Sequence, residues 1–156
     1  SLDYGPGTKL IGGLEYTRGK DVRLFIVDDD KIYNRKVLEN LIKNINHNKK
    51  ITAIRTWKYS KINVFTAAYG ILIDRYIIND DIIEQMKKFP NDSCKRGDDL
   101  WLSYIFYKNN IKIYSQFRYY WYIYLLTIKN IDSEAEASEG LGNKENYKNC
   151  KEILKF

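Results

Sequence analysis

The alternation of hydrophobic and polar residues predicts short strands and amphipathic helices along the chain. Residues 21–27 are apolar on both faces, which is typical of a strand buried in a mostly parallel sheet. Helical spacing begins at Asn34, and a second strand is expected over residues 51–56. Together these segments predict a βαβ unit with an acidic first turn. The apolar face of its helix consists of Val37, Leu38, Leu41, Ile42 and Ile45.

The rest of the chain continues this alternation, with no internal repeat or domain linker. Pro90 is expected to stop a helix, and loops are predicted over residues 90–97 and 132–142. We therefore expect one domain over residues 1–156, with an α/β fold in which helices flank a mostly parallel sheet. The further elements predicted are a helix from Thr8 that Gly19 ends, an interrupted strand over residues 61–73, a helix over 81–89, a helix that includes Leu100, Trp101, Tyr104 and Ile105, a strand over 111–114 and a helix over 143–156.

The composition is that of a folded domain with an excess of positive charge. The 156 residues are 44% hydrophobic and carry a formal net charge of +6. The Lys and Arg residues are scattered and form no nucleic-acid motif, so we expect no nucleic-acid partner. A positive field suits an anionic nucleotide ligand equally well. The most apolar run, residues 119–128, is shorter than the roughly 20 residues that a membrane span needs, so no span is expected in this chain.

The cysteine and histidine content limits which disulfides and metal sites the chain can form. Cys94 and Cys150 lack CxxC spacing, so we expect reduced, structural thiols rather than a disulfide framework, and an intracellular location. His47 is the single histidine, which excludes His-rich zinc sites. A bound metal would therefore have oxygen ligands, which favours Mn or Mg.

The strongest chemical signal is the run of carboxylates Asp28, Asp29 and Asp30, at the end of the first predicted strand. Adjacent carboxylates raise one another's pKa, so crowding is costly unless a cation or hydrogen-bond donors neutralise them. A solvated turn that caps the following helix would also explain the run. Its place after a buried strand favours a metal-nucleotide site, because ligands of α/β sheets bind at the carboxyl ends of strands.

The second signal is the pair Asp98 and Asp99, which follows Gly97 and opens a helical segment. Asp98 can serve as the N-cap, which leaves Asp99 available to accept a proton from a substrate hydroxyl. The turn from Gly5 to Lys9 could offer amides and an ammonium to a phosphate, although a plain turn explains it as well. Gly70 could let a substrate approach the backbone, and an irregular strand explains it nearly as well.

These motifs resemble those of GT-A glycosyltransferases, close to family 2. The stretch from Val27 to Tyr33 is similar to their DXD motif, and that from Asp98 to Tyr104 to the acidic motif before their acceptor-side helix. Across most of the chain the ordered set is similar to glycosyltransferases of algae and giant DNA viruses. Family members have a further strand and helix, which grip the nucleotide base, ahead of the segment corresponding to Asp3-Tyr4-Gly5-Pro6. We therefore expect a GT-A-like domain truncated at its N-terminus, viral in type, in a host cytoplasm.

The resemblance implies a metal-dependent, inverting transfer of a sugar from a nucleotide-sugar donor to a hydroxyl of a glycan, protein or lipid acceptor. Asp28 and Asp30 would contact Mn or Mg and the donor ribose-diphosphate, and Asp99 would be the base. The alternatives are a two-metal phosphoryl or nucleotidyl transferase, since Gly-Asp-Asp also marks polymerase palms, and a non-catalytic binding domain. The remaining site candidates are Asp3, Lys9 and Asp29 on the donor side and Gly70 and Asp98 on the acceptor side.

Overall fold

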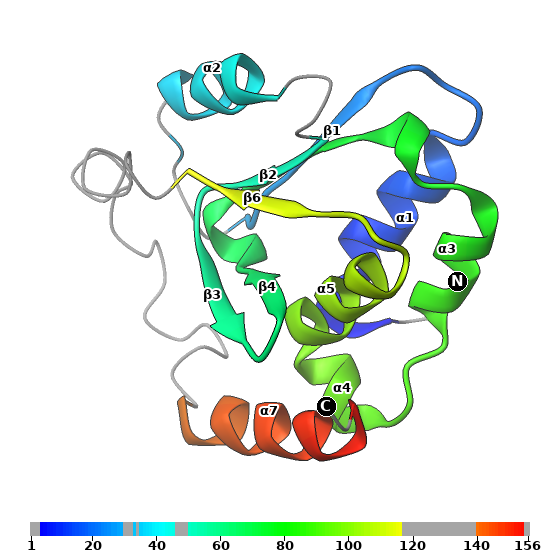
Figure 1. Cartoon of the computed structure of the whole chain (residues 1–156), viewed down its shortest axis with the longest axis vertical. Coiled ribbons are helices and arrows are strands. Elements are labelled where there is room, and N and C mark those ends of the chain that lie inside the picture. The colour runs from blue at the N-terminus through cyan, green and yellow to red at the C-terminus, as the bar shows by residue number, and fades with distance from the viewer. Residues whose placement is uncertain (1–3, 30–32, 34, 46–49, 117–139, 155–156) are drawn as a thin grey trace.

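The computed structural model describes residues 4–29, 33, 35–45, 50–116 and 140–154, which form a mixed α/β fold (Figure 1). Strands and helices alternate along much of the chain, as the hydrophobic pattern predicts. The helices are η1 (Gly5–Gly7), α1 (Thr8–Tyr16), α2 (Arg35–Asn44), η2 (Ala67–Tyr69), η3 (Arg75–Ile77), α3 (Asp80–Lys87), α4 (Asp92–Arg96), α5 (Asp98–Lys108) and α7 (Gly140–Leu154). The strands are β1 (Arg23–Ile26), β2 (Ile51–Ala53), β3 (Thr56–Tyr59), β4 (Ile62–Phe65), β5 (Ile71–Asp74) and β6 (Ile113–Ser115).

The main sheet is mixed rather than mostly parallel. Its described strands lie in the order β1-β5-β2-β6, and β5 is antiparallel to both β1 and β2, whereas β2 and β6 are parallel. Leu72 of β5 faces Phe25 on one side and Thr52 on the other. The expectation of a mostly parallel sheet was wrong because an apolar pattern on both faces reports burial and carries no information on strand direction.

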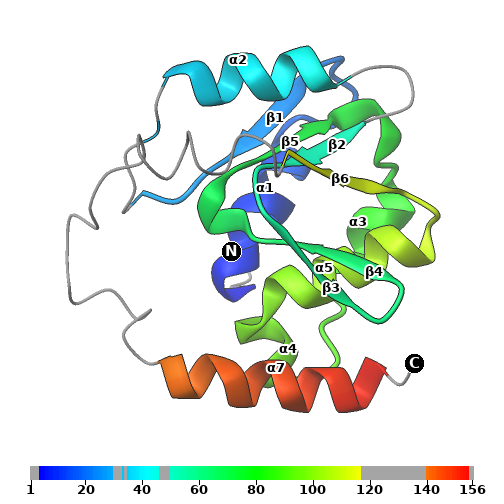
Figure 2. The same cartoon turned by 60° about the vertical axis from the view of Figure 1, so that its left-hand side comes forward.

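Helices cover both faces of this sheet. Helix α2 lies on one face, and α1, α3 and α5 lie on the other (Figures 1 and 2). Residues of β5 alternate between the two cores: Ile71 and Ile73 pack on the side of α1 and α5, and Leu72 packs with Val37 and Leu41 of α2. Every residue of β5 is buried. The strand is therefore enclosed on both faces, which explains its apolar run over residues 71–73.

Three local predictions differ from the structure. The segment expected as one interrupted strand over residues 61–73 is two strands, and β4 forms a separate hairpin with β3 that the sequence did not predict. The expected loop over residues 90–97 contains α4, whose N-cap Asn91 accepts a hydrogen bond from the backbone N–H of Cys94 at 2.8 Å. The last residues of the loop expected over 132–142 begin α7, and the earlier ones lie outside the described residues.

A disulfide joins Cys94 of α4 to Cys150 of α7, across 56 residues of sequence. The expectation of reduced thiols was therefore wrong. Spacing along the chain gave no signal, because the two cysteines meet only when α7 packs along α4 (Figure 2).

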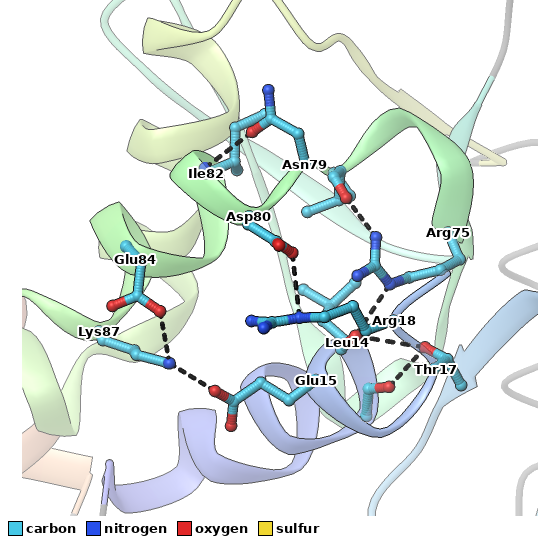
Figure 3. Close-up of polar contacts among 12 residues, drawn as sticks. Leu14, Glu15, Thr17, Arg18, Arg75, Asn79, Asp80, Ile82, Glu84 and Lys87 are labelled. Atoms are coloured by element: carbon cyan, nitrogen blue, oxygen red, sulfur yellow. Dashed lines mark hydrogen bonds and ion pairs between the residues drawn. The ribbon is translucent and has the colours of Figure 1, made fainter. Parts of the chain in front are cut away.

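Helix α1 is fixed to α3 at its C-terminal end by a polar network (Figure 3). Lys87 forms ion pairs with Glu15 of α1 and Glu84 of α3, and Arg18 Nε lies 3.1 Å from Asp80 Oδ1. The buried Arg75 guanidinium donates to the carbonyl oxygen of Leu14 at 2.8 Å. These contacts hold α1 at one end and so fix the direction in which its N-terminal turn points.

A membrane-spanning helix is not found in the part of the chain that the structure describes.

Candidate functional site

The predicted acidic clusters meet near one edge of the main sheet. Strands β1, β2 and β6 run in the same direction, so their carboxyl ends share an edge, and β5 begins at that edge. Asp28 and Asp29 follow β1 there, and η2 leads into β5. In sheets of this kind, ligands bind beyond the carboxyl ends of parallel strands.

Hydrogen bonds through η2 connect the two clusters. The backbone N–H of Asp28 donates to the Tyr33 hydroxyl at 2.9 Å, and that hydroxyl donates to the carbonyl oxygen of Ala68 at 2.9 Å. The neighbouring backbone N–H, that of Ala67, donates to the Asp99 carboxylate. The residues after β1 and the start of α5 are therefore both held by backbone groups of the same turn, η2.

Lys9, in the first turn of α1, adds positive charge between the clusters. Its ammonium forms an ion pair with Asp28, and its positive charge partly opposes the rise in pKa that burial causes at Asp98 and Asp99. The preceding turn packs closely on α5: a Cβ at Gly7 would lie 3.5 Å from that of Asp98. The segment predicted to bind a phosphate thus lies at the acidic clusters.

Asp98 and Asp99 are both buried, at 8% exposure each. Burial raises the pKa of Asp98 from 3.8 to about 6, and burial together with the Asp98 charge raises the pKa of Asp99 well above its ordinary value. The expectation that Asp98 is the N-cap was wrong, because Gly97 takes that position and α5 begins at Asp98. A carboxylate with a raised pKa is a suitable general base near neutral pH.

Tyr147 of α7 is a residue of this region that the sequence did not indicate. Its ring lies against Gly97, the residue before the acidic pair, with ring atoms 3.6 Å and 3.7 Å from the position of a Gly97 Cβ. Burial first, and then the charges of Asp99 and Asp98, raise the pKa of its phenol. The helix was predicted, but a helical pattern does not reveal which distant segment a helix covers.

Asp28 fits the role of a metal ligand. Its Oδ1 is buried and, apart from the Lys9 ammonium, has no hydrogen-bond partner among the described residues. A hard carboxylate oxygen of this kind suits Mn or Mg. Asp30 and Asp3 lie outside the described residues, and within the described part no group of three or more His, Cys, Asp or Glu side chains could hold a metal.

The remaining two candidates differ in setting. Asp29 is exposed in the turn after β1, next to Asp28. Gly70 has φ +99°, and a Cβ there would lie 3.0 Å from Phe25 Cε2 and 3.2 Å from Ile54 Cδ1. The close approach that we expected from a substrate is therefore made by two side chains of the protein itself.

Two cavities lie away from the acidic clusters. One, of about 680 Å³, is bordered by Arg18, Arg75 and Asp80, and the other, of about 410 Å³, by Asn63, Ser103 and Tyr114. Neither is lined by a residue that the sequence predicted for the site.

A comparison of the chain with protein-family models, with curated proteins and with solved structures finds no match.

Proposed function

We propose that this chain is a GT-A-like, metal-dependent glycosyltransferase domain that moves a sugar from a nucleotide-sugar to an acceptor hydroxyl, with inversion. One observation carries the proposal: η2 links Asp28 to Asp99 through Tyr33, Ala68 and Ala67. Asp28 supplies an oxygen ligand, and Asp99 a base, near the carboxyl ends of the parallel strands.

Each residue has a separate task in this proposal. Asp28 and Asp30 would hold Mn or Mg. The metal would neutralise negative charge on the departing nucleoside diphosphate. Lys9 offers a second positive charge to the same phosphates, and Asp29 is exposed next to Asp28 on the donor side. Asp99 takes the proton of the acceptor hydroxyl, and its burial beside Asp98 keeps its pKa high enough for that transfer.

The setting of the second cluster favours this function over the phosphoryl-transferase alternative. In a polymerase palm the Gly-Asp-Asp motif sits on a hairpin turn, whereas Asp98 and Asp99 form the first turn of α5. A non-catalytic binding domain would retain the donor contacts and lack transfer, so binding and turnover must be measured separately.

The test compares Asp99→Asn with Asp98→Asn in a sugar-transfer assay, beside calorimetric titrations with Mn and a nucleoside diphosphate. Asp99→Asn keeps the size of the side chain but cannot take a proton, so kcat should fall by about 10²-fold or more. Affinity for Mn and nucleotide should stay nearly unchanged in that variant. Asp98→Asn removes the charge that helps to raise the Asp99 pKa but leaves Asp99 able to take a proton, so turnover should fall much less than in Asp99→Asn.

The metal site is tested with Asp28→Asn. This variant should lose Mn binding in the presence of UDP or GDP, while Asp99→Asn keeps it. A fully active Asp99→Asn enzyme would reject Asp99 as the base. Binding without transfer in the wild type, across a set of nucleotide-sugars and acceptors, would favour the binding-domain alternative.

A further inference from the structure

Tyr147 lies in α7 and borders the acidic pair, which belongs to α5. Its ring packs edge-on against Trp57 with centroids 5.6 Å apart, and it also contacts Gly97. The phenol thus lies where α7 approaches the first turn of α5. Because burial, and then the charges of Asp99 and Asp98, raise its pKa, the hydroxyl is protonated near neutral pH and can donate a hydrogen bond.

The disulfide fixes the position of Tyr147. Cys150 lies three residues after Tyr147, on the same side of α7, and its bond to Cys94 ties this turn to α4, directly before the acidic pair. Lys151 adds weaker contacts. Its carbonyl oxygen accepts from the Tyr59 hydroxyl at 3.4 Å, and its ammonium lies 5.2 Å from the Trp57 ring centroid and 4.9 Å from that of Tyr59. The covalent link is thus the strongest constraint on the register of α7.

We propose that Tyr147 is a positioning residue for the acceptor alcohol and that the Cys94–Cys150 disulfide holds it in place. This inference rests on the proposed function and assigns α7 to the acceptor side of the site. The phenol donates a hydrogen bond to an acceptor oxygen other than the one that reacts. Asp99 takes the proton from the acceptor hydroxyl that reacts. The aromatic ring keeps water from the first turn of α5, which preserves the burial of the acidic pair.

The bond also makes the site sensitive to reductants. A dithiol reduces the disulfide to two thiols and is itself oxidised to a disulfide, so the sulfur and electron balance is complete. Helix α7 then keeps only its noncovalent contacts. The acceptor side of the site should loosen, while Asp28 and Lys9, which lie on other elements, keep their arrangement.

The first test is Tyr147→Phe, which keeps the ring and removes the hydroxyl. The acceptor KM should rise about tenfold, the value expected for one lost hydrogen bond, with kcat and Mn-nucleotide affinity nearly unchanged. The matched control is Tyr16→Phe, because Tyr16 is 79% exposed and far along α1 from Lys9. An unchanged acceptor KM in an active Tyr147→Phe enzyme would overturn the inference and leave the proposed function standing.

The second test asks whether the disulfide acts through Tyr147. Reduction of the full chain by a dithiol should raise the acceptor KM of the wild type but have little further effect on Tyr147→Phe, as expected for coupled groups. Circular dichroism checks that the reduced chain stays folded, and the Cys94→Ser, Cys150→Ser double variant gives the same comparison without reductant. Additive effects would overturn the positioning role of the disulfide.

A third measurement does not need activity. Tyr147→Ala exposes the first turn of α5, so the pKa of the Asp98 carboxyl, followed by NMR, should fall from about 6 towards 3.8. An unchanged pKa would contradict the placement of Tyr147 over the acidic pair. A wild type that transfers no sugar, with the pKa shift present, would reject the proposed function while keeping Tyr147 at the site.

Discussion

The backbone N–H of Ala67 donates to both carboxylate oxygens of Asp99, at 3.3 Å each. Ala67 begins η2, the turn that delivers the chain into β5, so the start of α5 is tied to the sheet edge. Burial and the Asp98 charge raise the pKa of this carboxyl. The hydrogen bond favours the charged carboxylate and lowers the pKa, but by less, so the net shift is upward. Asp99 is thus held in one orientation and remains a stronger base than an exposed aspartate.

The burial of the acidic pair should make folding stability depend on pH. Because the pKa of Asp98 is raised from 3.8 to about 6, the folded protein binds a proton that the unfolded chain has already released between these values. Stability is therefore highest below pH 3.8 for this group, falls as pH rises to about 6, and stays reduced above it. The cost at neutral pH is on the order of 3 kcal/mol.

Asp98→Asn should remove this cost. We expect the variant to be more stable than the wild type by about 1–3 kcal/mol at pH 7.5 and equally stable near pH 3.5, measured by urea unfolding at each pH. The Asp98 charge also raises the pKa of Asp99. The stability difference between variant and wild type should therefore keep growing at pH values above the pKa of Asp98. A stabilisation of the same size at both pH values would show that packing, and not charge, is responsible.

The sequence predicted those parts of the structure that short-range patterns determine. The expected burial of β1 was wrong, because β1 lies at the edge of the described sheet and only Ile26 of its residues is buried. The positions of β1 and of helix α2 nevertheless follow from hydrophobic periodicity, which is a property of neighbouring residues. The acidic residues after β1 and at the start of α5 were located for the same reason. Their proximity was expected from the rule that strand ends share an edge, and Lys9 and η2 now connect them.

The features that the sequence did not predict depend on contacts between distant segments. The turn of the β3–β4 hairpin has Ser60 at φ 51°, a conformation usually marked by Gly or Asn, so no turn signal was present. The insertion of β5 between β1 and β2 is set by its partners on both sides. The same holds for Cys94 and Cys150, which are brought together by the packing of α7 on α4.

Lys9 gives a second prediction, because its ammonium and a divalent cation compete for the same oxygen of Asp28. Lys9→Met should strengthen Mn binding in the absence of nucleotide by a few-fold and weaken nucleoside diphosphate binding by about tenfold, since a positive charge beside the phosphates is lost. Stability should fall by about 1–2 kcal/mol, as the pair is only partly exposed.

Calorimetry and urea unfolding measure these effects, and Lys20→Met is the control. Lys20 lies beyond the other end of α1 and loses the same charge, with only its contact to the exposed Tyr16 ring at stake. Equal losses of nucleotide affinity in the two variants would mean that the net charge of the protein, and not the position of Lys9, attracts the phosphates.

Gly70 and Gly12 form a pair whose substitution by alanine should have opposite effects. At Gly70 an alanine would be strained at φ +99°, and its Cβ would lie 3.0 Å from Phe25, so Gly70→Ala should destabilise the protein by about 3 kcal/mol. Gly12 lies within α1 and a Cβ there meets nothing within 4 Å, so Gly12→Ala should stabilise by about 0.5–1 kcal/mol. Urea unfolding at pH 7 measures both.

Because η2 ends at Gly70, strain there should also reach Ala67 and Asp99, and Gly70→Ala should lower sugar transfer as well as stability. A Gly70→Ala protein with unchanged stability would mean that β5 can shift by several tenths of an ångström without disturbing the sheet, which would contradict the tight packing of Phe25 and Ile54 around this position.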